Sequence, residues 1–197
     1  MNTVRIVKEN DLAQIAKIHK QQFADHYLGN FSEKLLLRFY ESFYNDKDII
    51  FIVYEDQIGI RGFIVGGNLH KINNASSYFI KNNIPLYGAE IIIRPKTWLK
   101  SIKKLVNVVF KKKPNPVSLD AVMDYTLLSI AVSKDAQGLG VASKMIDKFD
   151  EIMKEKSDDY FLSVHDTNDR ALGFYYKKGF TKERHFDGEV QFVKKIR

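Results

Sequence analysis

Apolar residues recur along the chain at spacings that predict alternating strands and helices. Residues 4–7 alternate as a short strand. Asp11 is expected to cap a first helix, and Ser32 precedes a second with apolar residues at helical spacing. Residues 49–54 and 58–65 read as two further strands, and the short connection between them predicts a hairpin.

The middle third has a less regular pattern. Gly66-Gly67 is expected to end the preceding strand, and polar, asparagine-rich sequence follows it. Residues 97–110 have apolar residues on one face and lysines on or beside the other, a spacing that predicts a helix. We therefore predict one domain, 1–197, with an inserted, basic, partly helical segment at about 67–120.

The last third has clear boundaries. Residues 125–132 form a nearly continuous apolar strand, which is typical of a strand covered on both faces. The glycine-rich turn 137–140 leads into a helix, and 160–164 forms another strand. A further helix is expected from Asn168 to Gly179, and Asp187-Gly188 predicts a closing hairpin.

Composition limits the class of protein. The 197 residues are 45% hydrophobic and 28% charged, a globular balance. No apolar run approaches the length of a membrane-spanning helix, and the first residues lack the apolar core of a secretory signal. The chain has no cysteine, which excludes disulfides, thiolate metal ligands and a cysteine nucleophile. We expect a cytoplasmic protein without a metal site.

Positive charge is concentrated in one stretch. The net charge is +7, from 31 basic and 24 acidic residues. Eight basic residues and no acidic one lie between Arg94 and Lys113, so the rest of the chain has 23 basic (31 − 8) against 24 acidic residues. A nucleic-acid partner is not expected, because such binders carry a broad basic surface, and a local anionic partner fits better.

An apolar strand, a glycine turn and a helix can together bind phosphate. The first turn of a helix has unpaired N–H groups and a partial positive charge. Gly138 and Gly140 let phosphate oxygens approach this backbone, and Gln137 can add an amide donor. The alternative is that these glycines only make a tight connection. The chain has no GxxxxGK[ST] sequence and no complete GxGxxG turn, which argues against a nucleotide kinase and a Rossmann dehydrogenase.

Two spaced motifs over residues 125–182 resemble the GCN5-related N-acetyltransferase (GNAT) superfamily. The first is the Gln/Arg-x-x-Gly-x-Gly/Ala turn, matched by Gln137, Gly140 and Ala142. The second is a later Asn…Ala…Tyr…Gly-Phe pattern, matched by Asn168, Ala171, Tyr175, Gly179 and Phe180. The preceding strands and helices are similar to the family in order only.

The resemblance implies an α/β (α+β) GNAT fold, with a central mixed, twisted sheet of about seven strands and helices on both faces. The fourth and fifth strands, here 125–132 and 160–164, would be parallel and splayed, with acetyl-CoA as cosubstrate between them. Tyr175 would donate a proton to the departing thiolate. The cofactor-binding residues implied are Ile130, Val132, Gln137, Gly138, Leu139, Gly140, Val141, Ala142, Ser143, Asn168 and Ala171.

Each assignment has an alternative. Tyr175 can be an ordinary packed aromatic, and Tyr176 is a rival hydroxyl in a less suitable register. Asn168 can act as a helix cap while also contacting the cofactor. Lys177 is within reach of a nucleotide phosphate in the family arrangement, but a solvated helix lysine is the plainer interpretation.

The general base is left open. Many relatives place a glutamate eleven residues before the glutamine of the turn, where this chain has Thr126. Asp124 is the nearest carboxylate on the same strand, and Glu90 and His26 are more remote candidates. Ordered water leading to bulk solvent is another route. His165 and Asp166 end the second splayed strand, but a neighbouring His–Asp pair is more often a loop feature.

The function expected from the resemblance is N-acetyl transfer from acetyl-CoA to a primary amine by direct attack in a ternary complex. A small acceptor, an amino sugar or a sugar nucleotide, would suit the basic segment if the acceptor is anionic. The alternatives are a non-catalytic acyl-CoA-binding or interaction module, and a protein, peptide or polyamine N-acetyltransferase. Residues 97–113 could instead lie on an anionic membrane surface, or pack as an ordinary helix with solvated lysines. The oligomeric state is left open.

Overall fold

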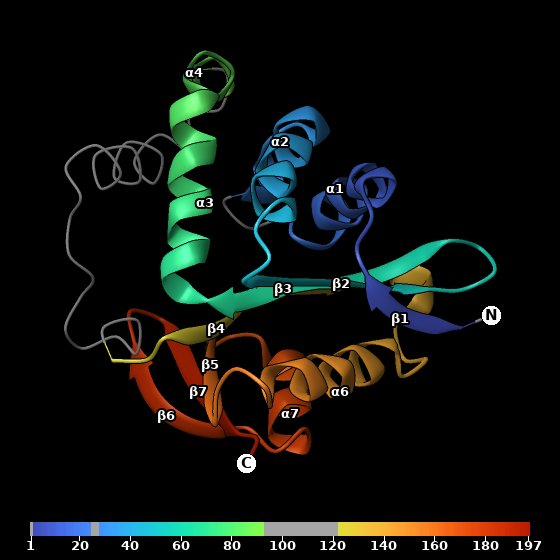
Figure 1. The fold of residues 1–197 in the computed structure, drawn as a ribbon, viewed down its shortest axis with the longest axis vertical. Coiled ribbons are helices and arrows are strands. Elements are labelled where there is room, and N and C mark those ends of the chain that lie inside the picture. The colour runs from blue at the N-terminus through green and yellow to red at the C-terminus, as the bar shows by residue number, and fades with distance from the viewer. Residues whose placement is uncertain (1, 25–27, 93–121) are drawn as a thin grey trace.

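A seven-stranded mixed sheet forms the centre of the computed structural model, which describes residues 2–24, 28–92 and 122–197. The strand order is β1-β2-β3-β4-β5-β7-β6, and β4 and β5 are its parallel pair (Figure 1). The strands are β1 (Thr3–Ile6), β2 (Ile49–Glu55), β3 (Ile60–Asn68), β4 (Tyr125–Val132), β5 (Asp159–His165), β6 (Thr181–Phe186) and β7 (Glu189–Lys195). The predicted sheet of about seven strands is confirmed.

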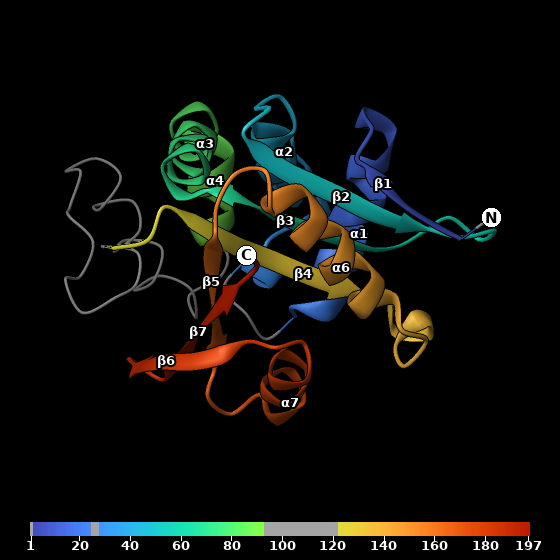
Figure 2. The same ribbon diagram turned by 60° about the horizontal axis from the view of Figure 1, so that its bottom comes forward.

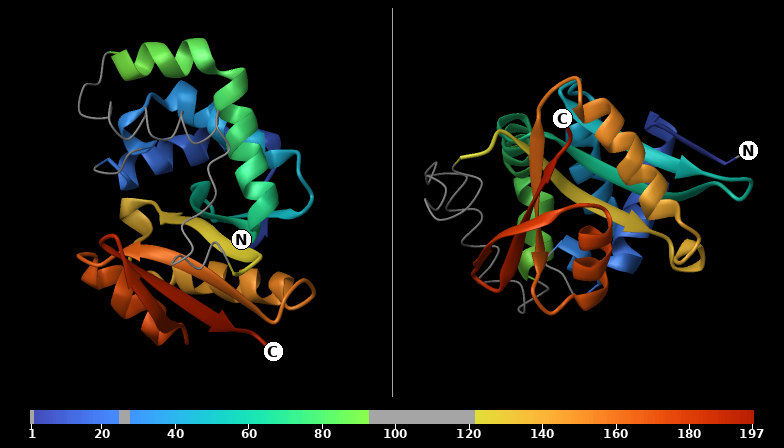
Figure 3. Two further views of the ribbon diagram at one scale, coloured as in Figure 1. Left: turned by 90° about the vertical axis from the view of Figure 1, so that its left-hand side faces the viewer. Right: turned by 90° about the horizontal axis from the view of Figure 1, so that it is seen from below.

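Helices cover both faces of this sheet, as predicted. In Figure 1 one face carries α1 (Leu12–Gln22), α2 (Glu33–Tyr44), α3 (Leu69–Asn82) and α4 (Ile84–Ile92). The opposite face carries α6 (Val141–Met153) and α7 (Asp169–Lys177), and the left view in Figure 3 shows the same layers from the side. Within the described ranges, none of the helices combines the length and apolar character needed to span a bilayer.

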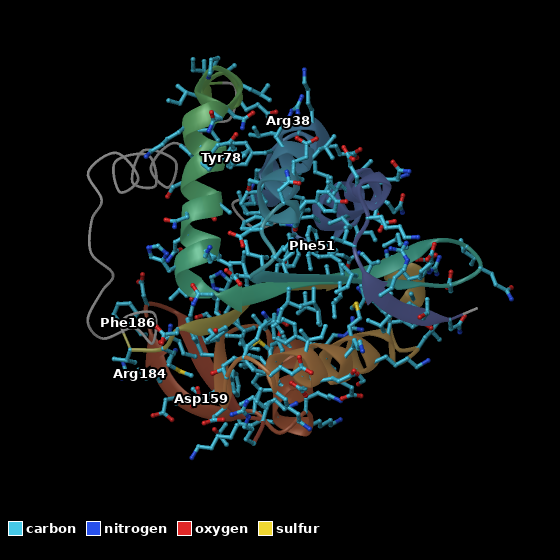
Figure 4. The ribbon with its side chains drawn as sticks, in the orientation of Figure 1. Arg38, Phe51, Tyr78, Asp159, Arg184 and Phe186 are labelled. Carbon is cyan, nitrogen blue, oxygen red and sulfur yellow. The ribbon has the colours of Figure 1, made fainter. Side chains whose placement is uncertain are left out.

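Each face of the sheet has its own apolar core. Phe51 of β2 lies beneath α1 and α2, as Figure 4 shows, and packs with the buried aromatic residues of α2. The other core contains Phe149 of α6 and Tyr160 of β5, whose rings meet edge to face at 5.1 Å. Arg38, also labelled in Figure 4, is on the outer side of α2.

The prediction that Gly66 and Gly67 end a strand was wrong. β3 runs through both glycines to Asn68, whose side chain accepts a hydrogen bond from the Lys71 amide and so caps α3. A Cβ at Gly66 would lie 2.6 Å from the ring of Phe149, so this glycine allows a close helix–sheet contact. The first strand of the pair also ends later than expected, at Glu55, and the second begins at Ile60.

Asp11 does not cap the first helix as predicted. It ends a 3-10 turn, Glu9–Asp11, and its side chain makes no capping hydrogen bond to α1. Its carboxylate accepts hydrogen bonds from Arg5 at 2.6 and 3.0 Å and from the Lys8 amide at 2.7 Å. The Asp11 carboxylate therefore bonds to the Arg5 guanidinium and the Lys8 amide rather than to the free N–H groups at the start of α1.

The asparagine-rich stretch forms the long helix α3, which its local composition did not indicate. Asparagine is a poor helix former, but Ile72, Ala75 and Phe79 are buried against the sheet and α2. Pro85 follows in the first turn of α4, where a missing N–H costs little. The helix predicted over 97–110 lies outside the described residues.

Candidate active site

β4 and β5 diverge from a single point of contact. Their pairing consists of Thr126 opposite Phe161, and the Thr126 hydroxyl donates a 3.0 Å hydrogen bond to the Phe161 carbonyl. Beyond it the strands take different directions, which Figure 2 shows as an open angle between β4 and β5. The wedge leaves backbone groups on the facing edges of both strands available to a ligand.

A β-bulge at Leu128 bends β4 where this wedge opens. Ser129 pairs with Val65 and Leu127 pairs with Gly66, so Leu128 has no partner on β3. Bulges bend a strand and redirect its side chains. Leu128 is 42% exposed, so the expectation that β4 would be covered on both faces fails at this position.

The turn after β4 presents open backbone at the start of α6. Gly138 and Gly140 have φ of 82° and 75°, the left-handed conformation that glycine adopts without strain. A Cβ built on either glycine would meet no atom within 4 Å. The N–H groups of the first turn of α6 therefore face a space that a phosphate could fill.

A cavity of about 390 Å³ lies at this turn. It is bounded by the end of α1, the second half of β4, the start of α6 and the N-terminal turns of α7. Its lining includes the sequence-predicted residues Ile130, Val132, Gln137, Gly138, Gly140, Val141, Ala142, Ser143, Asn168, Ala171 and Tyr175. Leu139 does not line it and its side chain is exposed.

A second cavity of about 240 Å³ continues into the wedge between β4 and β5. Residues that line both cavities are Phe23, Ile130, Asn168, Ala171 and Tyr175. Ser129 of β4, His165 of β5 and Glu189 of β7 line the second cavity alone. The two cavities therefore meet where β4 faces α7, and Tyr175 lies at this junction.

Tyr175 is held by aromatic packing. Its ring contacts Phe180 at 5.3 Å and Phe192 at 5.9 Å between centroids, and the residue is 7% exposed. Burial raises the pKa of its hydroxyl, so it stays protonated at physiological pH. Among the described residues this hydroxyl has no hydrogen-bond partner. Tyr176 is 53% exposed and lines neither cavity.

Gln137 connects two helices at the rim of the larger cavity. Its Nε2 donates to Gln22 Oε1 at 2.7 Å, and its Oε1 accepts from Arg170 Nη1 at 2.6 Å. Arg170 lines this cavity and was not predicted from the sequence, where it is one of many basic residues. Asn168 caps α7 by accepting from the Ala171 amide at 3.1 Å, so its expected capping role is present.

The carboxylates proposed as the base lie away from these cavities. Asp124 is exposed before β4, and Glu90 accepts hydrogen bonds from the backbone and hydroxyl of Ser32. His26 lies outside the described residues. Glu189, which the sequence did not single out, is the carboxylate on the second cavity, and only its register opposite His165 identifies it.

Known proteins that are similar to this chain include acetyltransferases. Residues 108–180 match the model of the acetyltransferase (GNAT) family, and no curated protein matches the chain. A PaiA N-acetyltransferase from Thermoplasma acidophilum, in complex with coenzyme A, is 16% identical with a TM-score of 0.57 over 99% of each chain. An N-acetyltransferase from Staphylococcus aureus Mu50 is 16% identical with a TM-score of 0.64, covering 97% of this chain and 99% of that one. The ribosomal-protein-S18-alanine N-acetyltransferase from Escherichia coli is 17% identical with a TM-score of 0.56, covering 100% and 94%.

The mixed sheet with its parallel β4–β5 pair and helices on both faces matches the fold of these solved acetyltransferases. Residues 108–180 also match the GNAT acetyltransferase model, and the chain has the fold of solved acetyltransferases.

Proposed function

We propose that the chain transfers the acetyl group of acetyl-CoA to a primary amine by direct attack in a ternary complex. Acetyl-CoA supplies the acetyl group as an activated thioester. The observation that carries the proposal is the Tyr175 hydroxyl, without a partner among the described residues at the junction of the two cavities. Since the chain has no cysteine, an acyl-cysteine intermediate is excluded.

The lining of the larger cavity fits coenzyme A. The edge of β4 at Ile130 and Val132 would pair with the pantetheine amides. The amides at the start of α6, with Gly138 and Gly140, would hold the pyrophosphate. Arg170 at the rim would add a charged donor to a phosphate oxygen, and Asn168 would contact the pantetheine side.

Tyr175 would act as the general acid. A buried, neutral phenol holds its proton until a strong base forms beside it, and a departing thiolate is such a base. The second cavity would then receive the amine from the β5 and β7 side of the wedge, next to Ser129.

For the acceptor we propose a small anionic amine, such as an amino sugar or a sugar nucleotide. The support is the run of eight basic residues between Arg94 and Lys113, which lies outside the described residues. A peptide amine is the alternative, since the similar structures include an enzyme named for a ribosomal-protein alanine. A panel of amino sugars, sugar nucleotides, peptides and polyamines distinguishes them by kcat/KM.

Calorimetry with coenzyme A and a thiol-release assay with that panel test the function. Tyr175→Phe should lower kcat about 100-fold or more and change the Kd for coenzyme A less than about twofold, because only the proton donor is lost. Tyr176→Phe is the matched control and should be unchanged. Binding of coenzyme A without thiol release by any amine would support a binding module instead. Wild-type activity in Tyr175→Phe would reject Tyr175 as the acid.

A further inference from the structure

The two cavities at the wedge differ in charge. The larger one has the Arg170 guanidinium at its rim and the N–H groups at the start of α6, and none of its described lining residues is acidic. Of the described residues that line the second cavity, Glu189 is the one carboxylate, and neither lysine nor arginine is among them. The larger cavity therefore suits the phosphates of coenzyme A, and the second cavity suits a cation.

The closing hairpin places Glu189 on this cavity. The residue follows the turn at 187–188 and lies directly opposite His165 of β5, so the two side chains share one face of the sheet. Val190 and Phe192 are buried in the core with α6 and α7. Because side chains alternate along a strand, Glu189 points to the other face, on which α1 and α2 lie (Figure 1).

The Glu189 carboxylate has no partner within the described ranges. The residue is partly buried, yet its side chain makes no hydrogen bond or ion pair with residues 2–24, 28–92 or 122–197. Asp166, just after β5, lies by contrast 2.8 Å from Nε2 of His185. A partly buried carboxylate loses hydration, and a cation that binds beside it offsets this cost. In an acetyl transfer the cation that enters the site is the protonated amine.

We propose that Glu189 binds the acceptor amine as its ammonium ion and takes the proton that must leave before attack. This inference rests on the proposed acetyl transfer. An alkylamine such as that of lysine has a pKa of about 10.4, so well under about 1% of it is neutral and able to attack at pH 7. A carboxylate on the cavity meets this need. An anionic part of the acceptor would lie outside the cavity.

Glu189 and Tyr175 then act from opposite faces of the wedge. Glu189 takes one proton from the ammonium ion, and the nitrogen lone pair forms the C–N bond at the thioester carbon. The C–S bond breaks with its electron pair on sulfur, which takes the Tyr175 proton. The nitrogen passes its remaining extra proton to the tyrosinate, and Glu189 releases its proton to solvent. Both residues thereby return to their starting states.

Glu189→Gln removes the charge with little change of shape, and Glu189→Asp keeps it on a shorter side chain. We expect kcat/KM at pH 7 to fall about 100-fold in the first and about tenfold in the second. The Kd for coenzyme A should change less than about twofold, because Glu189 does not line the larger cavity. Glu183→Gln, exposed on β6 and away from both cavities, is the matched control and should be unchanged. Wild-type kcat/KM in Glu189→Gln would overturn the proposal.

Alkaline pH separates proton removal from shape. Between pH 7 and 9 the neutral fraction of an alkylamine rises about 100-fold, so the loss in Glu189→Gln should shrink to less than about tenfold. The other titratable groups on the cavity are His165 and Tyr175, and β6 presents Phe186 opposite Glu189. Burial raises the pKa of Tyr175, so it stays protonated at pH 9. His165→Gln should keep the pH dependence of the wild type, and an equal loss in Glu189→Gln at both pH values would overturn the proposal.

Equilibrium binding gives a readout apart from turnover. Coenzyme A has no acetyl group to transfer, so its complex with the protein binds an amine without reaction. In calorimetry at pH 7, the fastest amine of the panel should bind this complex about tenfold more weakly in Glu189→Gln than in the wild type. Equal Kd values would overturn the proposal. Absence of thiol release by the wild type with every amine would instead defeat the proposed function, whereas an active wild type with an unaltered Glu189→Gln defeats only this inference.

Discussion

Arg170 donates a 2.6 Å hydrogen bond to the side-chain oxygen of Gln137, which ties α7 to the turn before α6. The same glutamine donates to Gln22 at the end of α1. Three segments far apart in the sequence therefore meet at the rim of the larger cavity. The guanidinium is held at the place where the phosphates of coenzyme A would reach the glycine turn.

Arg170→Ala should weaken coenzyme A binding about tenfold, because a charged donor to phosphate is lost at a partly solvated rim. Calorimetry measures this effect. Pantetheine, which lacks the phosphates, should bind the variant and the wild type equally. An equal loss for both ligands would assign Arg170 to shaping the cavity rather than to phosphate. Lys177→Ala, at the far end of α7, is the control and should change neither affinity.

Gly140→Ala should destabilise the fold by about 1–2 kcal/mol, because alanine must adopt the left-handed backbone found there. Urea unfolding measures the loss, and coenzyme A affinity should fall with it. Gly173→Ala is the matched control. This glycine lies inside α7, its added Cβ would meet nothing within 4 Å, and alanine should stabilise the helix by about 0.5–1 kcal/mol. If both substitutions changed the free energy of unfolding in the same direction, the left-handed backbone of Gly140 would not explain the effect.

The strand–turn–helix order of the site could be predicted because its signals are local. Gly138 and Gly140 mark the turn in the sequence itself, and Asn168 marks the start of the next helix. The bulge at Leu128 could not be predicted in this way, because it exists only in the register of β4 against β3. A sequence gives the residues of each strand but not the partner that each residue faces.

Features set by tertiary contacts were missed for the same reason. The asparagines of α3 predict irregular structure, and burial of Ile72 and Phe79 overrides that local preference. Arg170 and Glu189 become site residues only after α7 and β7 have packed beside the wedge. Asp11 had an obvious local role as a cap, but Arg5 gives its carboxylate a stronger partner.

Arg5→Met should lower the free energy of unfolding by about 2 kcal/mol at pH 7, because it removes charged hydrogen bonds from the buried Asp11. Burial raises the pKa of this carboxyl, but the bonds from Arg5 and Lys8 outweigh burial and lower it below 3.8. The stabilisation from the Arg5–Asp11 hydrogen bonds is therefore present above about pH 4, and it is lost as the pH falls through the lowered pKa of Asp11.

Urea titrations of the wild type and Arg5→Met at neutral and acid pH check this dependence. The difference between them should shrink toward zero as the pH falls through the lowered pKa of Asp11. Arg38→Met removes the exposed pair with Glu41 and should cost less than about 0.5 kcal/mol at either pH. A difference independent of pH would mean that Arg5 acts through its aliphatic packing.

Alkaline pH should destabilise the fold through buried phenols. Burial raises the pKa values of Tyr40, Tyr160 and Tyr175 above the ordinary value of 10.0. Above pH 10 the unfolded chain releases these protons and the folded chain keeps them, so stability falls with rising pH. The expected slope is about 4 kcal/mol per pH unit, about 1.4 for each group.

Tyr175→Phe should reduce that slope by about 1.4 kcal/mol per pH unit, and Tyr176→Phe should leave it unchanged because Tyr176 is exposed. Urea unfolding between pH 11 and 12, where the unfolded tyrosines are almost fully ionised, provides the measurement, with tyrosinate absorbance followed in parallel. An unaltered slope in Tyr175→Phe would show that this hydroxyl ionises equally in the folded and unfolded states.

The lone Thr126–Phe161 pairing gives the sheet a seam. On one side lie β1 to β4, and on the other lie β5, β7 and β6, with little backbone hydrogen bonding to hold the halves together beyond that point. An acyl-CoA that forms hydrogen bonds with the facing edges of β4 and β5 would hold the two parts of the sheet together. Because a ligand that binds only the folded protein stabilises it, the free energy of unfolding should rise with the concentration of acetyl-CoA.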